Sequence, residues 1–384
     1  MLSRGVQQPH AAVRRLGLCQ LSLGHLDRAP AHFQGGRFVS ETVTQRRKPA
    51  RRCQTLVSSN AIREQHGKEA ILCQRFKAHD AAITAVLVAR DKGNKKEIIT
   101  ASLDKTLALW SLEEDEDGEY TCKPGAMQEV VRIHPEGAPV FSLAQDDWAR
   151  GEVQHQIFCG KQSRDVVAWD PPADALHDAV VLNGHTGWVR ALATQGRWLY
   201  SAGCNYLRQW DMARSVPRHV RQVKMDKGDI LDVAVSPHHV YIAGANGSIR
   251  SWNVDKKGEL TPAAARDKAH TDRVTAVVWH KNFLYSTSYS GSLKMWDGNT
   301  LELVAEVPAA HGGGRIHCAA AGPDGYLYTG GDDKLVRRWQ PADLTPAASE
   351  ALYSHHYPVR ALSAGPSEVL VSADAKGEVC MWTL

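Results

Sequence analysis

Residues 274–307 have the sequence VTAVVWHKNFLYSTSYSGSLKMWDGNTLELVAEV, in which short β-rich runs alternate with turn residues. Four of these runs predict strands, and they cover Val274–Val278, Phe283–Ser288, Leu293–Trp296 and Glu302–Glu306. Strands this short, joined by turns this tight, indicate one four-stranded antiparallel sheet. The first run is almost entirely apolar, so we expect both faces of the sheet to be covered by other parts of the chain.

A tryptophan ends the third run of this unit, and the same arrangement recurs along the chain. Seven β-rich runs end in tryptophan, namely LALW (107–110), VVAW (166–169), LRQW (207–210), IRSW (249–252), LKMW (293–296), LVRRW (335–339) and VCMW (379–382). Successive tryptophans are 59, 41, 42, 44, 43 and 43 residues apart. A histidine stands upstream of six of them, namely His79, His134, His185, His270, His311, and His355 or His356. A period of about 40–45 residues is typical of propeller blades.

This pattern resembles the WD40-repeat family, whose units open with Gly-His and end with Trp-Asp. The resemblance covers about residues 70–384, although Gly-His survives only at 184–185 and Trp-Asp only at 169–170, 210–211 and 296–297. It implies an all-β fold, a seven-bladed WD40 β-propeller with four-stranded antiparallel blades. Only two residues follow Trp382, so the resemblance also implies that Ile71–Phe76 (ILCQRF) completes blade 7 and closes the ring.

Family geometry gives the repeated polar residues a structural role. The loop histidine, a strand Ser or Thr, a turn Asp and the tryptophan of a blade are expected to form a hydrogen-bonded chain. The matching residues are His79, Ser102, Asp104, Trp110, His185, Trp210, His270, Trp296, His311, Asp333, Trp339 and Trp382, with Thr329 offering the hydroxyl in the sixth repeat. A His/Ser/Asp set also resembles a hydrolase triad, but its recurrence in repeated modules favours structure over catalysis. We therefore expect no enzyme and no catalytic residue.

The first two repeats have longer and more strongly charged loops than the others. These are Glu113–Glu119 (EEDEDGE), Asp146–Gln156 and Asp91–Glu97, which the family's blade order places on one rim of the disc. The loops are either a solvated cluster or a docking site for a basic partner. The candidate docking residues are Glu113, Glu114, Asp115, Glu116, Asp117 and Trp148.

The opposite rim carries the histidine loops, and many WD40 proteins hold peptides there. Residues on this rim that could anchor a partner are Trp188, Asn205, Arg273, Tyr289, Arg315, Asp332 and Tyr357. Arginine and aromatic residues are typical of binding hot spots. Packing within the rim is the alternative role for Trp188 and Arg315, because fold resemblance does not choose the face that is used.

The basic residues are concentrated at the start of the chain. Residues 1–59 carry a net charge of +8, whereas residues 60–384 carry −4. The first segment is Arg-rich, poor in acids and without an apolar core, which predicts an organelle transit peptide followed by a linker at 60–69. A disordered basic tail that stays on the protein is the alternative. The composition favours import into a plastid (chloroplast), with the mitochondrion and the cytosol as alternatives.

Several classes of site and location lose support from the sequence. The eight cysteines form no Cys-x-x-Cys pair, so we expect no metal site and no cofactor. No apolar run approaches the 18 or more residues of a membrane helix, so we expect no membrane insertion. Because residues 60–384 are net negative, we do not expect the ring as a whole to bind nucleic acid.

These patterns predict a non-catalytic protein–protein interaction scaffold. We expect a monomeric propeller that is imported into an organelle, binds other proteins on a rim and helps to assemble a macromolecular complex. One alternative is a substrate receptor of a cullin-type ubiquitin ligase in the cytosol or nucleus. Such receptors commonly carry Trp-Asp-x-Arg, and the motif at 210–214 is one residue too long. The other alternative is an organellar RNA-binding or ribosome-assembly factor.

Overall fold

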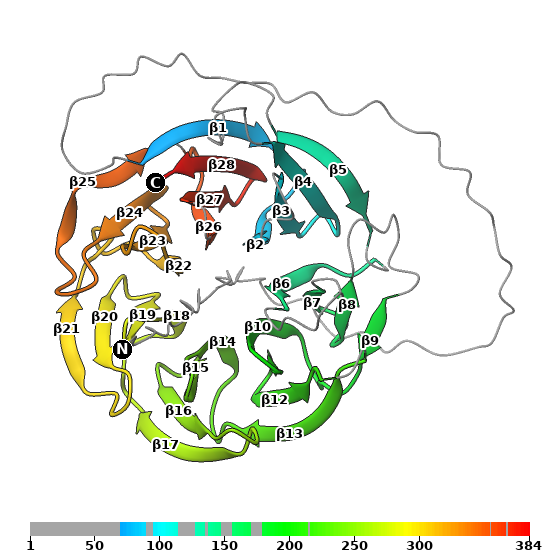
Figure 1. Cartoon of the computed structure of the whole chain (residues 1–384). Coiled ribbons are helices and arrows are strands. Elements are labelled where there is room, and N and C mark those ends of the chain that lie inside the picture. The colour runs from blue at the N-terminus through cyan, green and yellow to red at the C-terminus, as the bar shows by residue number, and fades with distance from the viewer. Residues whose placement is uncertain are drawn as a thin grey trace, which may run out of the picture.

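Each repeat folds into a four-stranded antiparallel sheet in which strands that follow one another in sequence are paired. The computed structural model describes residues 70–384, apart from 90–94, 114–126, 135–136, 147–155, 170–178, 214–215, 354 and 366–367. Seven such sheets stand around a central axis as the blades of a propeller (Figure 1). The expectation of an all-β, seven-bladed propeller is therefore confirmed. Residues 1–59 and 60–69, with their predicted roles, lie outside the described part of the chain.

The blades are numbered here along the chain, each from its innermost to its outermost strand. Blade 1 contains β2 (Ile83–Val88), β3 (Lys95–Ser102), β4 (Leu107–Glu113) and β5 (Met127–Ile133); blade 2 contains β6 (Val140–Gln145), β7 (Ile157–Lys161), β8 (Val166–Trp169) and β9 (Val180–Leu182); blade 3 contains β10 (Val189–Gln195), β11 (Trp198–Gly203), β12 (Tyr206–Asp211) and β13 (Arg218–Lys224). Blade 4 contains β14 (Ile230–Val235), β15 (His239–Gly244), β16 (Ile249–Val254) and β17 (Leu260–Arg266); blade 5 contains β18 (Val274–His280), β19 (Phe283–Ser288), β20 (Leu293–Asp297) and β21 (Leu303–Val307); blade 6 contains β22 (Ile316–Ala321), β23 (Leu327–Gly331), β24 (Leu335–Trp339) and β25 (Pro346–Tyr353). Blade 7 contains β26 (Val359–Ala364), β27 (Val369–Asp374), β28 (Glu378–Thr383) and, from the start of the chain, β1 (Ile71–Lys77).

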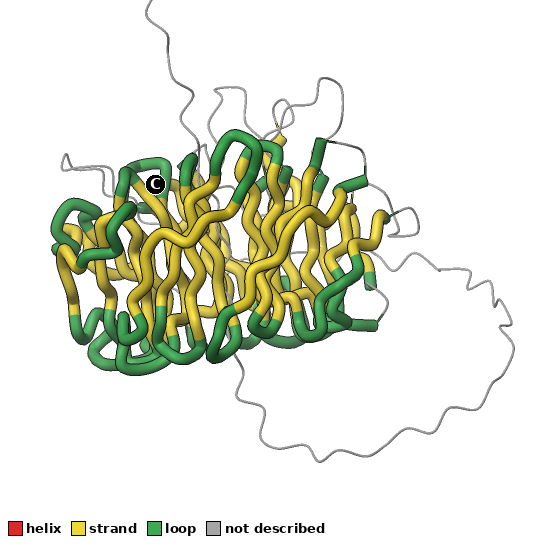
Figure 2. Tube along the Cα trace, turned by 90° about the horizontal axis from the view of Figure 1, so that it is seen from below, coloured by secondary structure: helices red, strands yellow, loops and turns green. Residues whose placement is uncertain are grey.

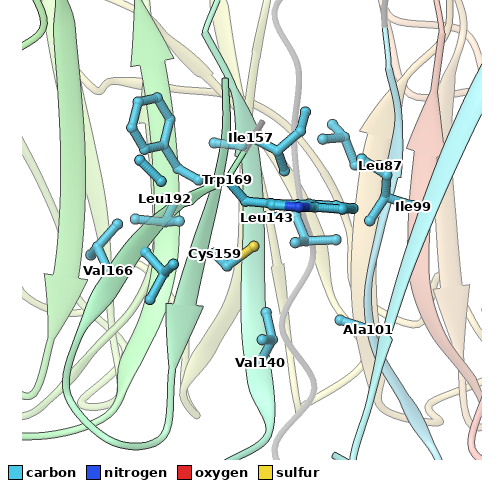
Figure 3. Packing of buried hydrophobic residues seen from close by; sticks show 14 of the residues in the cluster. Leu87, Ile99, Ala101, Val140, Leu143, Ile157, Cys159, Val166, Trp169 and Leu192 are labelled. Atoms are coloured by element: carbon cyan, nitrogen blue, oxygen red, sulfur yellow. The ribbon is translucent and has the colours of Figure 1, made fainter. Parts of the chain in front are cut away.

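The core lies between the blades, where each sheet covers the face of the next. The inner strands β2, β6 and β14 are buried at every position, which explains why the apolar runs do not alternate with polar residues. Inner strands of neighbouring blades are in contact around the whole ring. In Figure 3 the Trp169 ring of blade 2 points toward Leu87 and Ile99 of blade 1, and all three residues belong to one buried cluster. Full burial of a side chain such as that of Leu87 or Ile99 contributes about 1.5–3 kcal/mol to the free energy of unfolding.

The ring closes through β1, which is the outer strand of blade 7. It pairs antiparallel with β28, so that Leu72 lies opposite Trp382 and Phe76 opposite Val379. Figure 1 shows β1 beside β28 although the two strands are at opposite ends of the described chain. Phe76 is buried, and its ring centroid lies 4.7 Å from that of Trp110 in blade 1. β1 therefore links the last blade to the first.

The disc has two rims, as the side view shows (Figure 2). We call the rim at which the inner strands begin, for example at Val189 and Val274, the near rim. The far rim is the one at which the inner strands end, for example at Gln195 and Val235. In the described part of the chain, no helix is long and apolar enough to cross a membrane.

Deleting residues 70–78 removes β1 and leaves one edge of blade 7 unpaired. We expect the truncated protein to lose its cooperative melting transition, because the contacts of β1 with β28 and with blade 1 disappear together. Thermal unfolding followed by circular dichroism measures this. The matched control starts at residue 60 and keeps β1. An unchanged transition in the shorter protein would contradict closure by this strand.

Candidate functional site

Five blades contain a hydrogen-bonded chain of histidine, hydroxyl and tryptophan. In blade 5, His270 Nε2 lies 2.6 Å from Ser286 Oγ, and Trp296 Nε1 donates to the same oxygen at 2.8 Å. The corresponding triplets are His79–Thr100–Trp110 (2.7 and 2.9 Å), His185–Ser201–Trp210 (2.7 and 2.8 Å), His311–Thr329–Trp339 (2.8 and 2.8 Å) and His355–Ser372–Trp382 (2.7 and 2.9 Å). Each chain joins the loop before a blade to two strands of that blade.

The hydroxyl of blade 1 comes from Thr100 and not from Ser102, so the sequence-based assignment of Ser102 was wrong. Both residues are on β3, but Ser102 is at the end of the strand. Its hydroxyl donates to Ala81 O at 3.3 Å and accepts from Asp104 N at 3.1 Å, and so it holds the turn. The hydroxyl that meets the indole comes nine or ten residues before the tryptophan in all five blades. Blades 2 and 4 have Cys159 and Ile242 ten residues before theirs.

Aspartates reach the other histidine nitrogen in three blades. His79 Nδ1 lies 3.1 Å from Asp104, and His311 Nδ1 lies 2.7 Å from Asp333. In blade 7, His355 Nδ1 lies 3.5 Å from Asp374 Oδ2, an ion-pair contact that is longer than the hydrogen bonds of the other two blades. Burial works against ionisation of Asp104, but hydrogen bonds from His79 and Thr106 hold the pKa of its carboxyl below the usual range.

The chains are structural, since nothing can approach their hydroxyl groups. The Ser286 and Thr329 side chains are fully buried, and each oxygen already accepts a tryptophan N–H. Burial and the nearby Lys294 lower the pKa of His270 to about 3, so this ring is neutral at physiological pH. A nucleophilic site would need an accessible hydroxyl and oxyanion donors.

Thr100→Val keeps the shape of the side chain and removes its hydroxyl. We expect it to lower the free energy of unfolding by about 1–3 kcal/mol, because buried nitrogens of His79 and Trp110 lose their shared partner. Ser102→Ala, on the same strand, should cost less, since it leaves the His79–Trp110 chain intact. Chemical denaturation of both variants measures the difference. A larger loss for Ser102→Ala would contradict the assignment.

The near rim carries a second constellation, in which arginines surround one tyrosine. The guanidinium carbons of Arg273 and Arg315 lie 5.1 and 5.2 Å from the centre of the Tyr289 ring. The Tyr289 ring meets the His317 ring edge-on, with 5.6 Å between their centroids. Cations at this distance from an aromatic face are attracted by its quadrupole, so the three side chains from blades 5 and 6 support one another.

A buried histidine connects this group to blade 7. His317 Nε2 lies 2.5 Å from Asp332 Oδ1, and an Arg360 guanidinium nitrogen lies 3.2 Å from His317 Nδ1. Because arginine only donates, Nδ1 is the acceptor and Nε2–H donates to Asp332. The hydrogen bond from His317, with the charges of Arg360 and Arg315, outweighs burial and lowers the pKa of Asp332. Asp332 is therefore an anion held between cations.

Arg190 adds a fourth guanidinium from blade 3. Burial lowers its pKa, the nearby Arg273 acts in the same direction, and Asp229 opposes both. Its guanidinium carbon lies 5.1 Å from the Trp188 ring, which stacks on Phe141 at a centroid distance of 5.4 Å. We call the set Arg190, Arg273, Tyr289, Arg315, His317, Asp332 and Arg360 the mouth cluster, because these residues stand at or near the near-rim ends of the inner strands.

The structure thus joins four of the residues that the sequence singled out on this rim, namely Arg273, Tyr289, Arg315 and Asp332. Trp188 is linked to this group indirectly, because its ring contacts the Arg190 guanidinium. Asn205 and Tyr357 make other contacts, Asn205 with Met225 O at 3.4 Å and Tyr357 with Lys376 Nζ at 5.9 Å from its ring. Sequence reasoning missed Arg190, His317 and Arg360. Each is the second residue of an inner strand, a shared position that could have revealed them.

The acidic docking candidates cannot be placed in the same way. Glu114, Asp115, Glu116, Asp117 and Trp148 lie outside the described residues. Glu113 is the last residue of β4, where its backbone is opposite Lys95. Within the described ranges, no group of three His, Cys, Asp or Glu residues could hold a metal ion.

The protein-family comparison matches the repeats directly. The family model described as "WD domain, G-beta repeat" matches residues 71–111, 178–211, 265–297 and 302–340. The chain contains WD40 repeats. A solved structure, the WD40 β-propeller domain of Doa1, superimposes with a TM-score of 0.65 at 17% identity, covering 82% of this chain and 96% of that one. This WD40 propeller has the same fold as Doa1's, and proteins built on such propellers are generally non-catalytic scaffolds that bind other proteins.

Curated relatives of the WD40 propeller are distant and mostly longer. Telomerase protein component 1 of Rattus norvegicus is 26% identical over 64% of this chain and 10% of its own length. The ribosome biogenesis protein WDR12 homolog of Chlamydomonas reinhardtii is 25% identical over 53% of this chain and 51% of its own length. Striatin-4 of Mus musculus is 24% identical over 73% of this chain and 39% of its own length. The chain thus spans about half or less of the length of each of these relatives.

Proposed function

We propose that this protein is a non-catalytic scaffold that helps to assemble a macromolecular complex and docks one partner on the mouth cluster. The observation that carries the proposal is the gathering of Arg273 and Arg315 around Tyr289. Arginine and tyrosine are enriched among residues that dominate binding energy. Here they are held by neighbouring blades, so little side-chain entropy is lost when a partner binds.

The charge of the mouth cluster favours an acidic partner segment. The cluster contains four arginines and one carboxylate, that of Asp332. One oxygen of this carboxylate accepts a hydrogen bond from His317, so the cluster as a whole is positively charged. Arginine binds carboxylates through charge-assisted hydrogen bonds that are stronger than neutral ones. A monomeric propeller that presents such a surface on one rim suits a subunit of a larger complex.

Charge reversal at two positions tests this surface. Arg273→Glu with Arg315→Glu should deplete the co-purifying partners at least tenfold, because close charge pairs across interfaces are worth about 1.5–7 kcal/mol. Quantitative mass spectrometry after affinity purification of the full chain measures the depletion. Lys268→Glu, an exposed lysine on the loop before blade 5, is the matched control. Equal partner lists for a folded double variant would refute docking at the mouth.

The basic segment at residues 1–59 supports a second part of the proposal, import into a plastid. A fluorescent protein fused to the C-terminus should appear inside the plastid, and removal of residues 1–59 should leave the fusion in the cytosol. Mitochondrial fluorescence would replace the plastid with the mitochondrion. Cytosolic fluorescence of the full-length fusion would contradict import and favour the ubiquitin-ligase alternative.

Ribosome assembly is the second candidate function. It is favoured by the similarity to the WDR12 homolog, a ribosome biogenesis protein by its name. The mouth cluster would then contact an acidic segment of an assembly factor, or RNA phosphates. The mass-spectrometric experiment distinguishes ribosome assembly from the assembly of another complex. Ribosomal proteins among the partners that the double variant loses would indicate ribosome assembly.

A further inference from the structure

The outermost strand of blade 3, β13, has one backbone edge that is open to a further strand. It pairs with β12 on one side, and no other backbone hydrogen bond joins it to a described residue. Figure 1 shows β13 on the circumference of the disc, whereas the mouth cluster stands at the inner strands. Its seven residues, RHVRQVK (218–224), include no proline and no acid, and five of them are exposed. Unpaired N–H and C=O groups on such an edge are a template for a strand from another chain.

Three cations of the β12–β13 hairpin have no acidic partner. Arg208 on β12 and Arg218 and Lys224 on β13 make no ion pair with any residue that the structure describes. Burial lowers the pKa of Arg208, and only Tyr206 acts in the opposite direction, so no carboxylate stabilises this charge. Lys224 Nζ lies 5.8 Å from the centre of the Tyr206 ring, which is opposite it on β12.

The acids nearest to this hairpin are bound to other arginines. Asp211 is opposite Arg218 in the β12–β13 register, but both of its oxygens accept hydrogen bonds from Arg197. Glu259, on the turn of the next blade, is paired with Arg221. The charge that remains unsatisfied along β13 is therefore positive.

The two outer strands of the other blades show a different pattern. Their cations are paired with carboxylates, namely Arg132 with Glu129, Arg250 with Asp267, Lys294 with Glu306, Arg337 with Asp333, Arg338 with Asp324 and Arg75 with Glu378. The two remaining cations of these strands, Arg266 and Lys77, donate to backbone carbonyl groups. Uncompensated charge on the outer strands is thus concentrated on blade 3.

The backbone of the outer strands also favours β13 as a pairing edge. Among the others, β9 has three residues, β17 contains Pro262 and β25 begins with Pro346. Proline has no amide hydrogen and interrupts the ladder that an added strand needs. The charges of β1, β5 and β21 are already paired. Open backbone and unpaired cations therefore occur together on β13.

We propose that β13 is a docking edge, to which a partner protein adds an extended acidic segment as a fifth strand of blade 3. In this mode main-chain hydrogen bonds supply affinity and side chains supply specificity. Lys224 pairs with Tyr206 and Arg218 with Asp211, five positions apart on β12, so the two cations project from opposite faces of the sheet. The partner strand therefore carries an acid on each face.

The sign of the charge excludes other occupants of this edge. Like charges directly opposite each other on neighbouring strands are destabilising, so a basic strand or the β13 of a second copy is disfavoured. The inference extends the proposed scaffold function with a surface that shares no residue with the mouth cluster. One ring then holds two partners at once.

Fluorescence polarisation with labelled peptides tests this edge on the full chain. The probe is Gly-Glu-Val-Thr-Val-Thr-Glu-Gly, whose two acids are five positions apart. It is compared with a peptide in which Lys replaces both Glu and with one in which Pro-Pro replaces the central Thr-Val. We expect both replacements to weaken binding about tenfold or more, because the first reverses the charge pairs and the second breaks the ladder.

Matched protein variants locate the binding. Arg218→Glu with Lys224→Glu should weaken binding of the Glu peptide about tenfold, since two cross-strand charge pairs become repulsive. Lys256→Glu with Lys257→Glu is the control, because it makes the same charge change at exposed lysines of the next blade and should leave binding unchanged. Thermal melting followed by circular dichroism verifies that both variants are folded.

The mouth variants separate this edge from the proposed function. Arg273→Glu with Arg315→Glu should bind the Glu peptide as the unaltered protein does. Loss of binding in this variant with retention in the β13 variant would place the peptide at the mouth and overturn the edge. Absence of binding, equal affinity for the three peptides, or equal losses in the β13 and control variants would also overturn it. None of these outcomes changes the mass-spectrometric test of the mouth cluster.

Discussion

Every blade of this protein has two apolar faces, and a single four-stranded sheet cannot bury both by itself. The inner strands β2, β6 and β14 are buried at all positions because neighbouring blades cover them from both sides. Seven sheets satisfy this requirement only when they form a closed ring, so the pairing of β1 with β28 matters for every interface. Ring closure thus fixes the positions of the rims, on which the proposed docking surface lies.

The hydrogen-bonded chains fix the loops to the blades with buried polar groups. In five blades one hydroxyl oxygen meets both the Nε2 of the loop histidine and the indole N–H, so these two buried nitrogens are satisfied by a single side chain. Blades 2 and 4 have Cys159 and Ile242 ten residues before their tryptophans and keep the same four-stranded architecture. Inter-blade packing thus carries the fold, and the polar chains add local order where the loops must be held still.

Two surfaces on opposite rims follow from this scaffold. At the near rim, arginines from four blades converge around Tyr289 and the Asp332–His317 pair. At the far rim, Gly258 in a turn of blade 4 packs against the Trp198 ring of blade 3. Both surfaces combine an aromatic ring with nearby cations. Both are built by side chains from more than one blade.

The sequence by itself determined the architecture, because the tryptophan period and the apolar runs are local signals repeated seven times. It also singled out Arg273, Tyr289, Arg315 and Asp332, since their loops occupy equivalent places in the repeats. Only the tertiary structure decided that Thr100 and not Ser102 joins His79 to Trp110. The Thr100 hydroxyl lies between the two rings, whereas Ser102 lies at the end of β3 and bonds to the turn. Only the tertiary structure also placed Arg190, His317 and Arg360 in the mouth cluster. These sites are formed between residues that are distant in sequence, and one-dimensional patterns do not record which blades face one another.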